Sequence, residues 1–186
     1  MNDWVAISVT GRDRPGIVAS VARVLFQNGC NIEDLSQTAI RGQFAMILVT
    51  STTSRESLLG LQQDFDHLAG DLDLEIHLKP IQREEMQVFD TSETEPFVIT
   101  VRGKDRPGLV YGIAEILAER SINITKLDAR VALISGKQEY IQLFEVDIPK
   151  RLDYGLIQEK LRQRGQEMGI HVDLQHKDIF RAINQI

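Results

Sequence analysis

The sequence has few of the residues that build covalent or metal-based frameworks. One cysteine, Cys30, stands among the 186 residues, so neither an intramolecular disulfide nor a cysteine-rich metal site can form within the chain. The four histidines include no closely spaced pair of the kind that binds a metal ion. We therefore expect a protein with no metal and no cofactor.

Long apolar runs and an excess of positive charge are also missing. No run approaches the roughly 20 apolar residues that cross a bilayer, and the acidic start of the chain is unlike a signal peptide. We therefore expect a cytoplasmic protein with no membrane partner. The net charge of -6 repels the phosphates of nucleic acids, which disfavours direct binding to DNA or RNA.

The most informative feature that is present is an internal repeat. Residues 4–36 match residues 96–128 without a gap, at a constant offset of 92 residues that runs, for example, from Ile7 to Ile99. In a chain of 186 residues, two copies at this offset fill nearly the whole length. The repeat therefore predicts two domains of the same fold.

The stretch between the two copies differs from both in composition. It carries five acidic residues against one arginine, which is typical of a solvated linker. We predict a first domain over 1–80, an acidic linker over 81–95 and a second domain over 96–186. Residues 177–186 have the apolar spacing of a short amphipathic tail helix.

Each copy shows the same order of predicted elements. Strict alternation of apolar residues predicts a first strand through Val5, Ile7 and Val9, and helical spacing predicts a helix directly after it. Two strands, a second helix and a last alternating strand follow. The order β-α-β-β-α-β with right-handed crossovers predicts an α+β fold, the ferredoxin-like one, with both helices on one face of a four-stranded antiparallel sheet.

Several residues carry signals for the ends of these helices. Pro15 and Pro107 suit the first position of the first helix in each copy, where the missing N–H is not needed. Residues 53–56 fit a capping box, and Asp153 suits the N-cap of the matching helix in the second copy. Gly70 is the expected end of the second helix in the first copy.

The repeated turn Gly-x-Asp-Arg-Pro-Gly, between first strand and first helix, is the most distinctive site candidate. It spaces two glycines like a phosphate loop, but Ile17 and Val18 stand where Lys and Ser or Thr are required. A glycine turn that opens a helix still offers backbone N–H groups to a carboxylate, and Asp13 or Asp105 can accept hydrogen bonds from an ammonium group. Together these groups suit a free amino acid. The alternative is a tight structural corner in which Asp13 helps to cap the helix.

The two turns, the element order and the pairs Asn31-Ile32 and Asn123-Ile124 that open the second strands resemble the ACT domain. ACT domains are small regulatory modules that bind amino acids and pair sheet edge to sheet edge. Two such domains without an attached enzyme are similar to the glycine cleavage system transcriptional repressor family. This resemblance implies a cytoplasmic regulator, not an enzyme, that senses a small amino acid such as glycine. It also implies a protein partner through which transcription or metabolism is regulated, and no DNA-binding domain. Exposed sheet edges invite pairing, so we expect the two domains to pair side by side and the chain to assemble further into a homodimer.

The resemblance also implies where a ligand binds, namely between the turn of one domain and the start of the second strand of its neighbour. Carried over by position, the candidate ligand-binding residues are Gly11, Asp13, Arg14, Gly16 and Asn31 in the first copy, and Gly103, Asp105, Arg106, Gly108 and Asn123 in the second. Two other functions remain open. One is an accessory module without a ligand, and the other is a small-molecule enzyme that uses the acidic turn. No Ser-His-Asp or Cys-His arrangement repeats in both copies to favour the enzyme, so we expect no catalytic residues.

Overall fold

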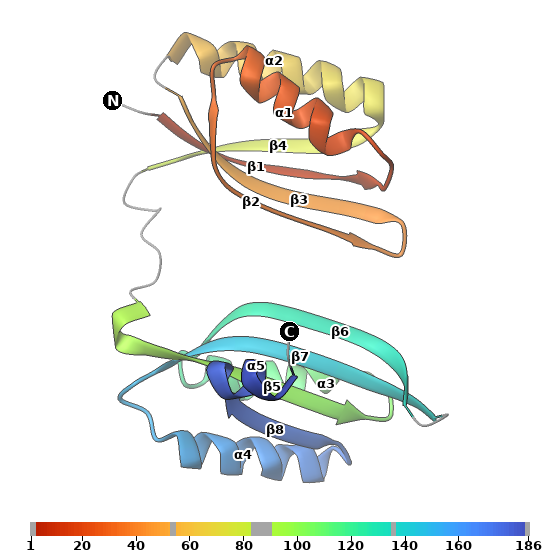
Figure 1. Ribbon diagram of the computed structural model, residues 1–186, viewed down its shortest axis with the longest axis vertical. Coiled ribbons are helices and arrows are strands. Elements are labelled where there is room, and N and C mark those ends of the chain that lie inside the picture. The colour runs from red at the N-terminus through yellow and green to blue at the C-terminus, as the bar shows by residue number, and fades with distance from the viewer. Residues whose placement is uncertain (1–2, 53–54, 83–90, 135–136, 185–186) are drawn as a thin grey trace. The chain divides into compact units, whose positions relative to one another are not determined.

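The computed structural model of the chain describes residues 3–52, 55–82, 91–134 and 137–184 (Figure 1). The chain divides into two compact units, Met1–Gln87 (unit 1) and Val88–Ile186 (unit 2), which are described separately. Most of the linker predicted at 81–95 falls on residues 83–90, outside the described part, so its boundaries stay a prediction.

Unit 1 is a four-stranded sheet with two helices on one of its faces (Figure 1). Its elements are β1 (Asp3–Arg12), α1 (Ile17–Gln27), β2 (Asn31–Ile40), β3 (Gln43–Thr52), α2 (Arg55–Leu72) and β4 (Leu74–Ile81). The strand order is β2-β3-β1-β4, and every neighbouring pair is antiparallel. This is the predicted βαββαβ fold.

Unit 2 repeats this arrangement and adds one helix. Its elements are η1 (Thr91–Glu93), β5 (Thr94–Gly103), α3 (Leu109–Ala118), β6 (Asn123–Ile134), β7 (Lys137–Pro149), α4 (Tyr154–Glu167), β8 (His171–His176) and α5 (Lys177–Asn184). The strand order β6-β7-β5-β8 is that of unit 1. The α+β, ferredoxin-like fold predicted for both copies is therefore confirmed.

An apolar core lies between the sheet and the helices of each unit. The alternating residues Val5, Ile7 and Val9 of β1 are 2%, 0% and 0% exposed, as their spacing predicts. The aromatic side chains Phe65 in unit 1 and Phe144 in unit 2 are fully buried within these cores. Burial of this apolar surface is the main force that holds each helix pair on its sheet.

Three of the predicted helix ends are wrong. The first helices begin not at Pro15 and Pro107 but two residues later, because a glycine in a left-handed conformation stands between each proline and the first helical residue. The second helix does not end at Gly70. It continues to Leu72, and Asp73 takes the positive φ, 47°, that reverses the chain. The capping box predicted at residues 53–56 includes positions outside the described part.

The N-cap predicted for α4 is confirmed. The Asp153 carboxylate accepts hydrogen bonds from Gly155 N at 2.8 Å and from Leu156 N at 3.3 Å. These bonds satisfy two of the backbone donors that a helix leaves open at its start.

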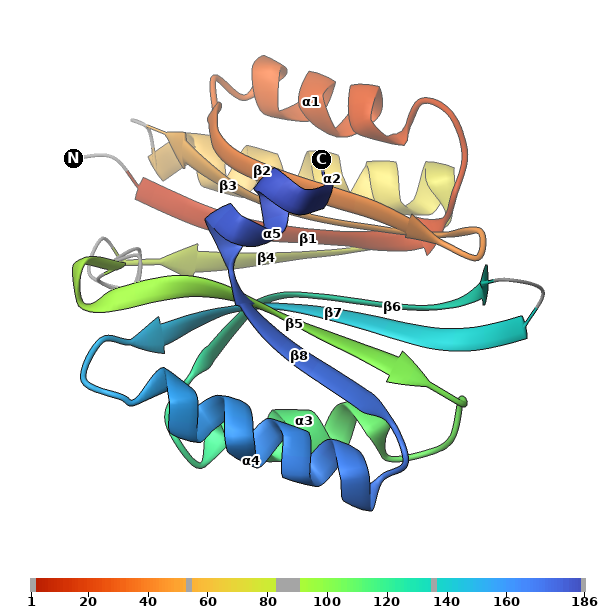
Figure 2. The same ribbon diagram turned by 60° about the horizontal axis from the view of Figure 1, so that its bottom comes forward.

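The added helix α5 lies on the face of the unit 2 sheet opposite α3 and α4 (Figure 2). Lys177 forms an ion pair with Glu145 of β7, which stands beside Val98 on this face. Val98 is 2% exposed, although it points away from the main core. The tail therefore shields part of the second face of this sheet.

Candidate functional site

The turn before the first helix has the same backbone form in both units. Gly16 and Gly108 are the N-caps of α1 and α3, with φ values of 98° and 91°, and no side chain caps either helix. The first intrahelical bonds run from Ser20 N and Gly112 N to these glycines, at 2.9 Å. The N–H groups that precede them lack helical partners and can bind an anion.

Open space lies beside both of these glycines. A Cβ built on Gly16 or Gly108 meets no atom within 4 Å. A ligand can therefore approach the backbone at this point without a clash.

Asp13 does not cap α1, so that part of the structural alternative is wrong. Its backbone N–H donates to the Gly42 carbonyl at 2.9 Å, while its side chain is exposed and makes no cap bond. Asp105 is exposed in the same way beside α3. Within the described residues, neither carboxylate is engaged by another side chain, so each is available to an ammonium group.

A hollow of about 770 Å³ lies against the turn of unit 2. It is lined by the turn residues 105–108, the first turn of α3 and Tyr140 of β7. Tyr140 reaches the turn because β7 places it directly opposite Gly103. Tyr140 is not predictable from the sequence, because nothing local indicates which residue of β7 lies opposite the end of β5.

The two predicted arginines take different positions. Arg106 donates a hydrogen bond to the carbonyl of Met168, the C-cap of α4, so it fastens the turn to that helix while it lines the hollow. Arg14 is exposed in the turn of unit 1.

The glycines that begin the two turns have a packing role. A Cβ on Gly11 would lie 2.5 Å from the Leu74 side chain and 3.2 Å from the Asp73 carbonyl oxygen. A Cβ on Gly103 would lie 2.6 Å from the Ile170 side chain. These positions therefore need glycine so that the last strand can pass close to the end of the first.

Asn31 lies at the opposite end of the unit 1 sheet from the turn. β3 pairs Ser51 with both Asn31 and Trp4, while Gly11 is at the other end of β1. At roughly 3.3 Å per residue, the ends of β1 from Trp4 to Gly11 are about 23 Å apart. One unit therefore does not bring its asparagine and its turn together, and a site shared between neighbouring domains stays a prediction.

The two asparagines also differ in their partners. Asn31 donates to the Glu33 carboxylate at 2.9 Å, whereas Thr125 stands at the equivalent position beside Asn123. Asn123 lines a small hollow of about 190 Å³ together with Asp147 and Arg151. The carboxamide of Asn31 is therefore held within its own unit.

Tyr111, on the rim of the larger hollow, belongs to a fixed chain of polar contacts. Its hydroxyl donates to Glu115, which also accepts from Arg164 at 3.1 Å. The bond from Tyr111 and then that from Arg164 lower the pKa of Glu115, and the same carboxylate raises the pKa of Tyr111. This hydroxyl is therefore held as a donor toward α3.

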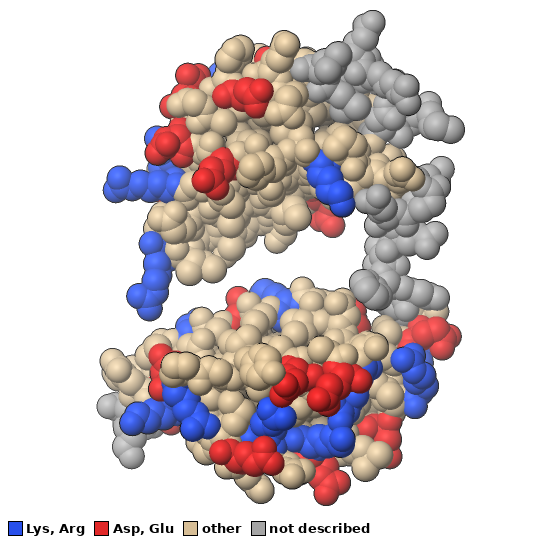
Figure 3. All heavy atoms as spheres, turned by 180° about the vertical axis from the view of Figure 1, so that it is seen from behind, with Lys and Arg blue, Asp and Glu red and all other residues tan. Residues whose placement is uncertain are grey.

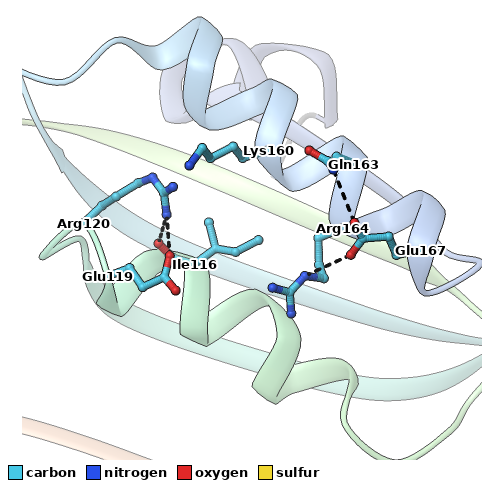
Figure 4. Close-up of a pocket in the computed structure, with 7 residues that line it drawn as sticks. All are labelled: Ile116, Glu119, Arg120, Lys160, Gln163, Arg164 and Glu167. Carbon is cyan, nitrogen blue, oxygen red and sulfur yellow. Dashed lines mark hydrogen bonds and ion pairs between the residues drawn. The ribbon is translucent and has the colours of Figure 1, made fainter.

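Another hollow, of about 180 Å³, lies between α3 and α4 (Figure 4). Arg120 pairs with Glu119 at 3.3 Å, and Arg164 pairs with Glu167 at 3.5 Å. Since most of its charged groups already neutralise one another, this hollow has less to offer a charged ligand than the turn.

Charged side chains of both signs are interspersed on the visible face of unit 2 (Figure 3). Over the described ranges, no group of three or more His, Cys, Asp or Glu side chains is placed to hold a metal ion. No helix within those ranges is both long enough and apolar enough to span a membrane.

Comparison with solved structures finds the same tandem arrangement elsewhere. A crystal structure of a protein from Galdieria sulphuraria matches 95% of this chain and 99% of its own, with a TM-score of 0.77 and 24% identity. The crystal structure of a proposed glycine cleavage system transcriptional repressor matches 94% of this chain and 97% of its own, with a TM-score of 0.72 and 21% identity. At these identities the likeness shows a shared fold.

Sequence comparison finds relatives that match about half of this chain over nearly their whole length. A UPF0237 protein of Methanopyrus kandleri is 36% identical over 90 residues, which is 48% of this chain and 96% of that protein. A UPF0237 protein of Methanocaldococcus jannaschii is 35% identical over 89 residues, again 48% of this chain and 96% of its own length. The family model of the ACT domain matches residues 4–79 and 95–175. With both repeats matched and both folded as βαββαβ units, this chain belongs to the ACT domain family.

Proposed function

We propose that this chain is a regulatory protein that senses a small amino acid and passes the signal to a protein partner. The observation that carries the proposal is the hollow beside Gly108, where uncapped N–H groups and the Asp105 carboxylate lie together. The backbone groups suit a carboxylate, and Asp105 suits an ammonium group. The site therefore offers one group to each charge of a free amino acid, the N–H groups to its carboxylate and Asp105 to its ammonium group.

The regulated process is transcription or metabolism. A similar tandem structure is that of a proposed glycine cleavage system transcriptional repressor, which makes glycine the first ligand to test and transcription the first process. For binding to act on a partner, the ligand must favour one arrangement of the chain over another. The chain acts in the cytoplasm through that partner and catalyses no reaction.

The proposal includes a homodimer. Strands β2 and β6 each pair on one side only, with β3 and β7, so both sheets have a long edge strand within their own unit. Unpaired strand edges favour association with another chain. Sedimentation at micromolar concentration should show a dimer, and a lone 21.0 kDa species would contradict this part of the proposal.

Thermal unfolding with each of the twenty amino acids tests ligand binding. An amino acid that binds the folded chain, added at a hundred times its dissociation constant, should stabilise it by about 2.7 kcal/mol. If none of the twenty raises the unfolding midpoint, the sensor function is wrong and the chain is an accessory module.

Calorimetry on two aspartate variants tests the site itself. Asp105→Ala removes a charged hydrogen-bond partner and should cost roughly 1.5–3 kcal/mol of binding. Asp13→Ala makes the same test in unit 1, and Glu159→Ala removes an exposed carboxylate elsewhere in unit 2 as a control. Equal binding by the parent, both aspartate variants and their double variant would show that the site is misassigned.

A further inference from the structure

One polar side chain in the core of unit 2 has no partner. Gln142 of β7 is 0% exposed, and within the described residues neither its amide nitrogen nor its amide oxygen makes a hydrogen bond. Buried polar groups are nearly always paired, because an unpaired one loses its bonds to water without compensation. This carboxamide therefore lowers the stability of unit 2 unless something supplies bonds to it.

Gln142 lies close to the hollow at the turn. It stands two residues from Tyr140 on the same face of β7, which places their backbones about 7 Å apart. Tyr140 lines the hollow, and Gln142 pairs across the sheet with Val101, just before the strand ends at Gly103. The unpaired carboxamide is thus the next side chain inward from the hollow along β7.

The matching positions of unit 1 are apolar. Phe44 stands opposite Gly11 as Tyr140 stands opposite Gly103, and Met46 stands opposite Val9 as Gln142 stands opposite Val101. Both Phe44 and Met46 are buried in the continuous apolar core of unit 1. The second copy therefore carries a phenol and a carboxamide where the first carries two apolar side chains.

The first residue of α3 also differs from the first residue of α1. Ile17, at the start of α1, belongs to the continuous apolar core of unit 1. Leu109, its counterpart in α3, is buried and lines the hollow, but it is not part of the continuous core found among the described residues of unit 2. Leu109 is therefore a buried apolar side chain that lines the hollow at the start of α3.

We propose that Gln142 and Tyr140 determine the ligand specificity of unit 2, and that they favour an amino acid with a neutral, hydrogen-bonding side chain over glycine. This inference rests on the proposed function. The ammonium and carboxylate groups bind at Asp105 and at the amides after Gly108. The ligand's carboxamide or hydroxyl group reaches inward from the hollow and bonds to the amide of Gln142.

Pairs of amino acids with similar shape test this inference directly. Calorimetry on the full chain should compare glutamine with methionine, asparagine with leucine, and threonine with valine. The polar member of at least one pair should bind about tenfold more tightly or better, because the apolar member leaves the Gln142 amide unpaired. Equal binding within every pair overturns the inference.

Two substitutions replace Gln142 and Tyr140 of unit 2 by the apolar residues that stand at the matching positions of unit 1. Gln142→Met should remove the preference for the polar member and, without ligand, raise the unfolding midpoint, because it removes the unpaired amide. Tyr140→Phe should weaken the preference, and it decides the question if Gln142→Met does not fold. Asp105→Ala should weaken the binding of both amino acids in a pair to the same extent.

The outcomes separate this inference from the proposed function. If amino acids bind but Gln142→Met keeps the parent's preference, the inference is wrong while the sensor function stands. A lowered midpoint with an unchanged preference would mean that Gln142 binds a buried water, and this also overturns the inference. If no amino acid binds the parent, both are wrong.

Discussion

Replacing Gly108 by alanine should destabilise unit 2 through backbone strain alone. The residue has φ 91° and ψ -4°, a left-handed conformation that costs a residue with a Cβ about 1–2 kcal/mol. No steric cost adds to this, since a Cβ at Gly108 meets no atom within 4 Å. In a unit of this size, the loss should lower the unfolding midpoint by about 5–10 °C.

The aromatic residues allow the effect to be assigned to one unit. The single tryptophan, Trp4, lies in unit 1, and the three tyrosines lie in unit 2. Gly108→Ala should lower the midpoint seen by tyrosine fluorescence and leave that of Trp4 unchanged, and Gly16→Ala should do the reverse. Gly108→Asn is the matched control, because asparagine tolerates this conformation better and should lose less stability. This prediction is wrong if the alanine variant keeps the parent's unfolding midpoint, or if the asparagine variant loses as much stability as the alanine variant. In either case the left-handed turn is not what stabilises the start of α3.

Three further predictions concern single contacts. Phe144→Ala empties a fully buried position and should cost about 3–5 kcal/mol in urea unfolding; a loss below about 1 kcal/mol would contradict its place in the core. Asp153→Ala removes the N-cap of α4 and should cost about 1 kcal/mol, whereas an unchanged midpoint would mean that the cap bonds are not made in solution. Hydrogen bonds from Ser51 and then Asn31 lower the pKa of Glu33, so their stabilising effect is complete above the ordinary glutamate pKa and is lost as the pH falls through the lowered value. Ser51→Ala should raise the pKa of Glu33 in an NMR titration of the carboxyl group, and an unshifted titration would refute the bond.

The repeat and the alternation of apolar residues were enough to predict the fold. Val5, Ile7 and Val9 alternate because one face of β1 is buried, and that pattern is local in the sequence. Helix ends were less predictable. Gly70 looks like a stop, but burial of Leu72 against the core favours one more half-turn, and the chain reverses at Asp73 instead.

The candidate site was predicted only in part, because half of it is not local. The turn from Gly103 to Gly108 is visible as a motif, and its backbone geometry follows from its glycines. Tyr140 reaches the turn, with Gln142 two residues further along the same face, only through the register of β7 against β5, which is fixed by pairing across the whole sheet. The exchange of two apolar residues for two polar ones becomes visible only when equivalent positions are matched through that register.

The helix α5 makes the two copies of the repeat unequal in the surface that their sheets expose. In unit 2 it occupies part of the sheet face that α3 and α4 leave open, while in unit 1 no described element of the same unit lies on that face, where Ile47 is 58% exposed. Within its own unit, the first sheet therefore keeps apolar surface that the second sheet has partly covered. Two units with the same strand order thus differ in surface chemistry on the side away from their helix pairs.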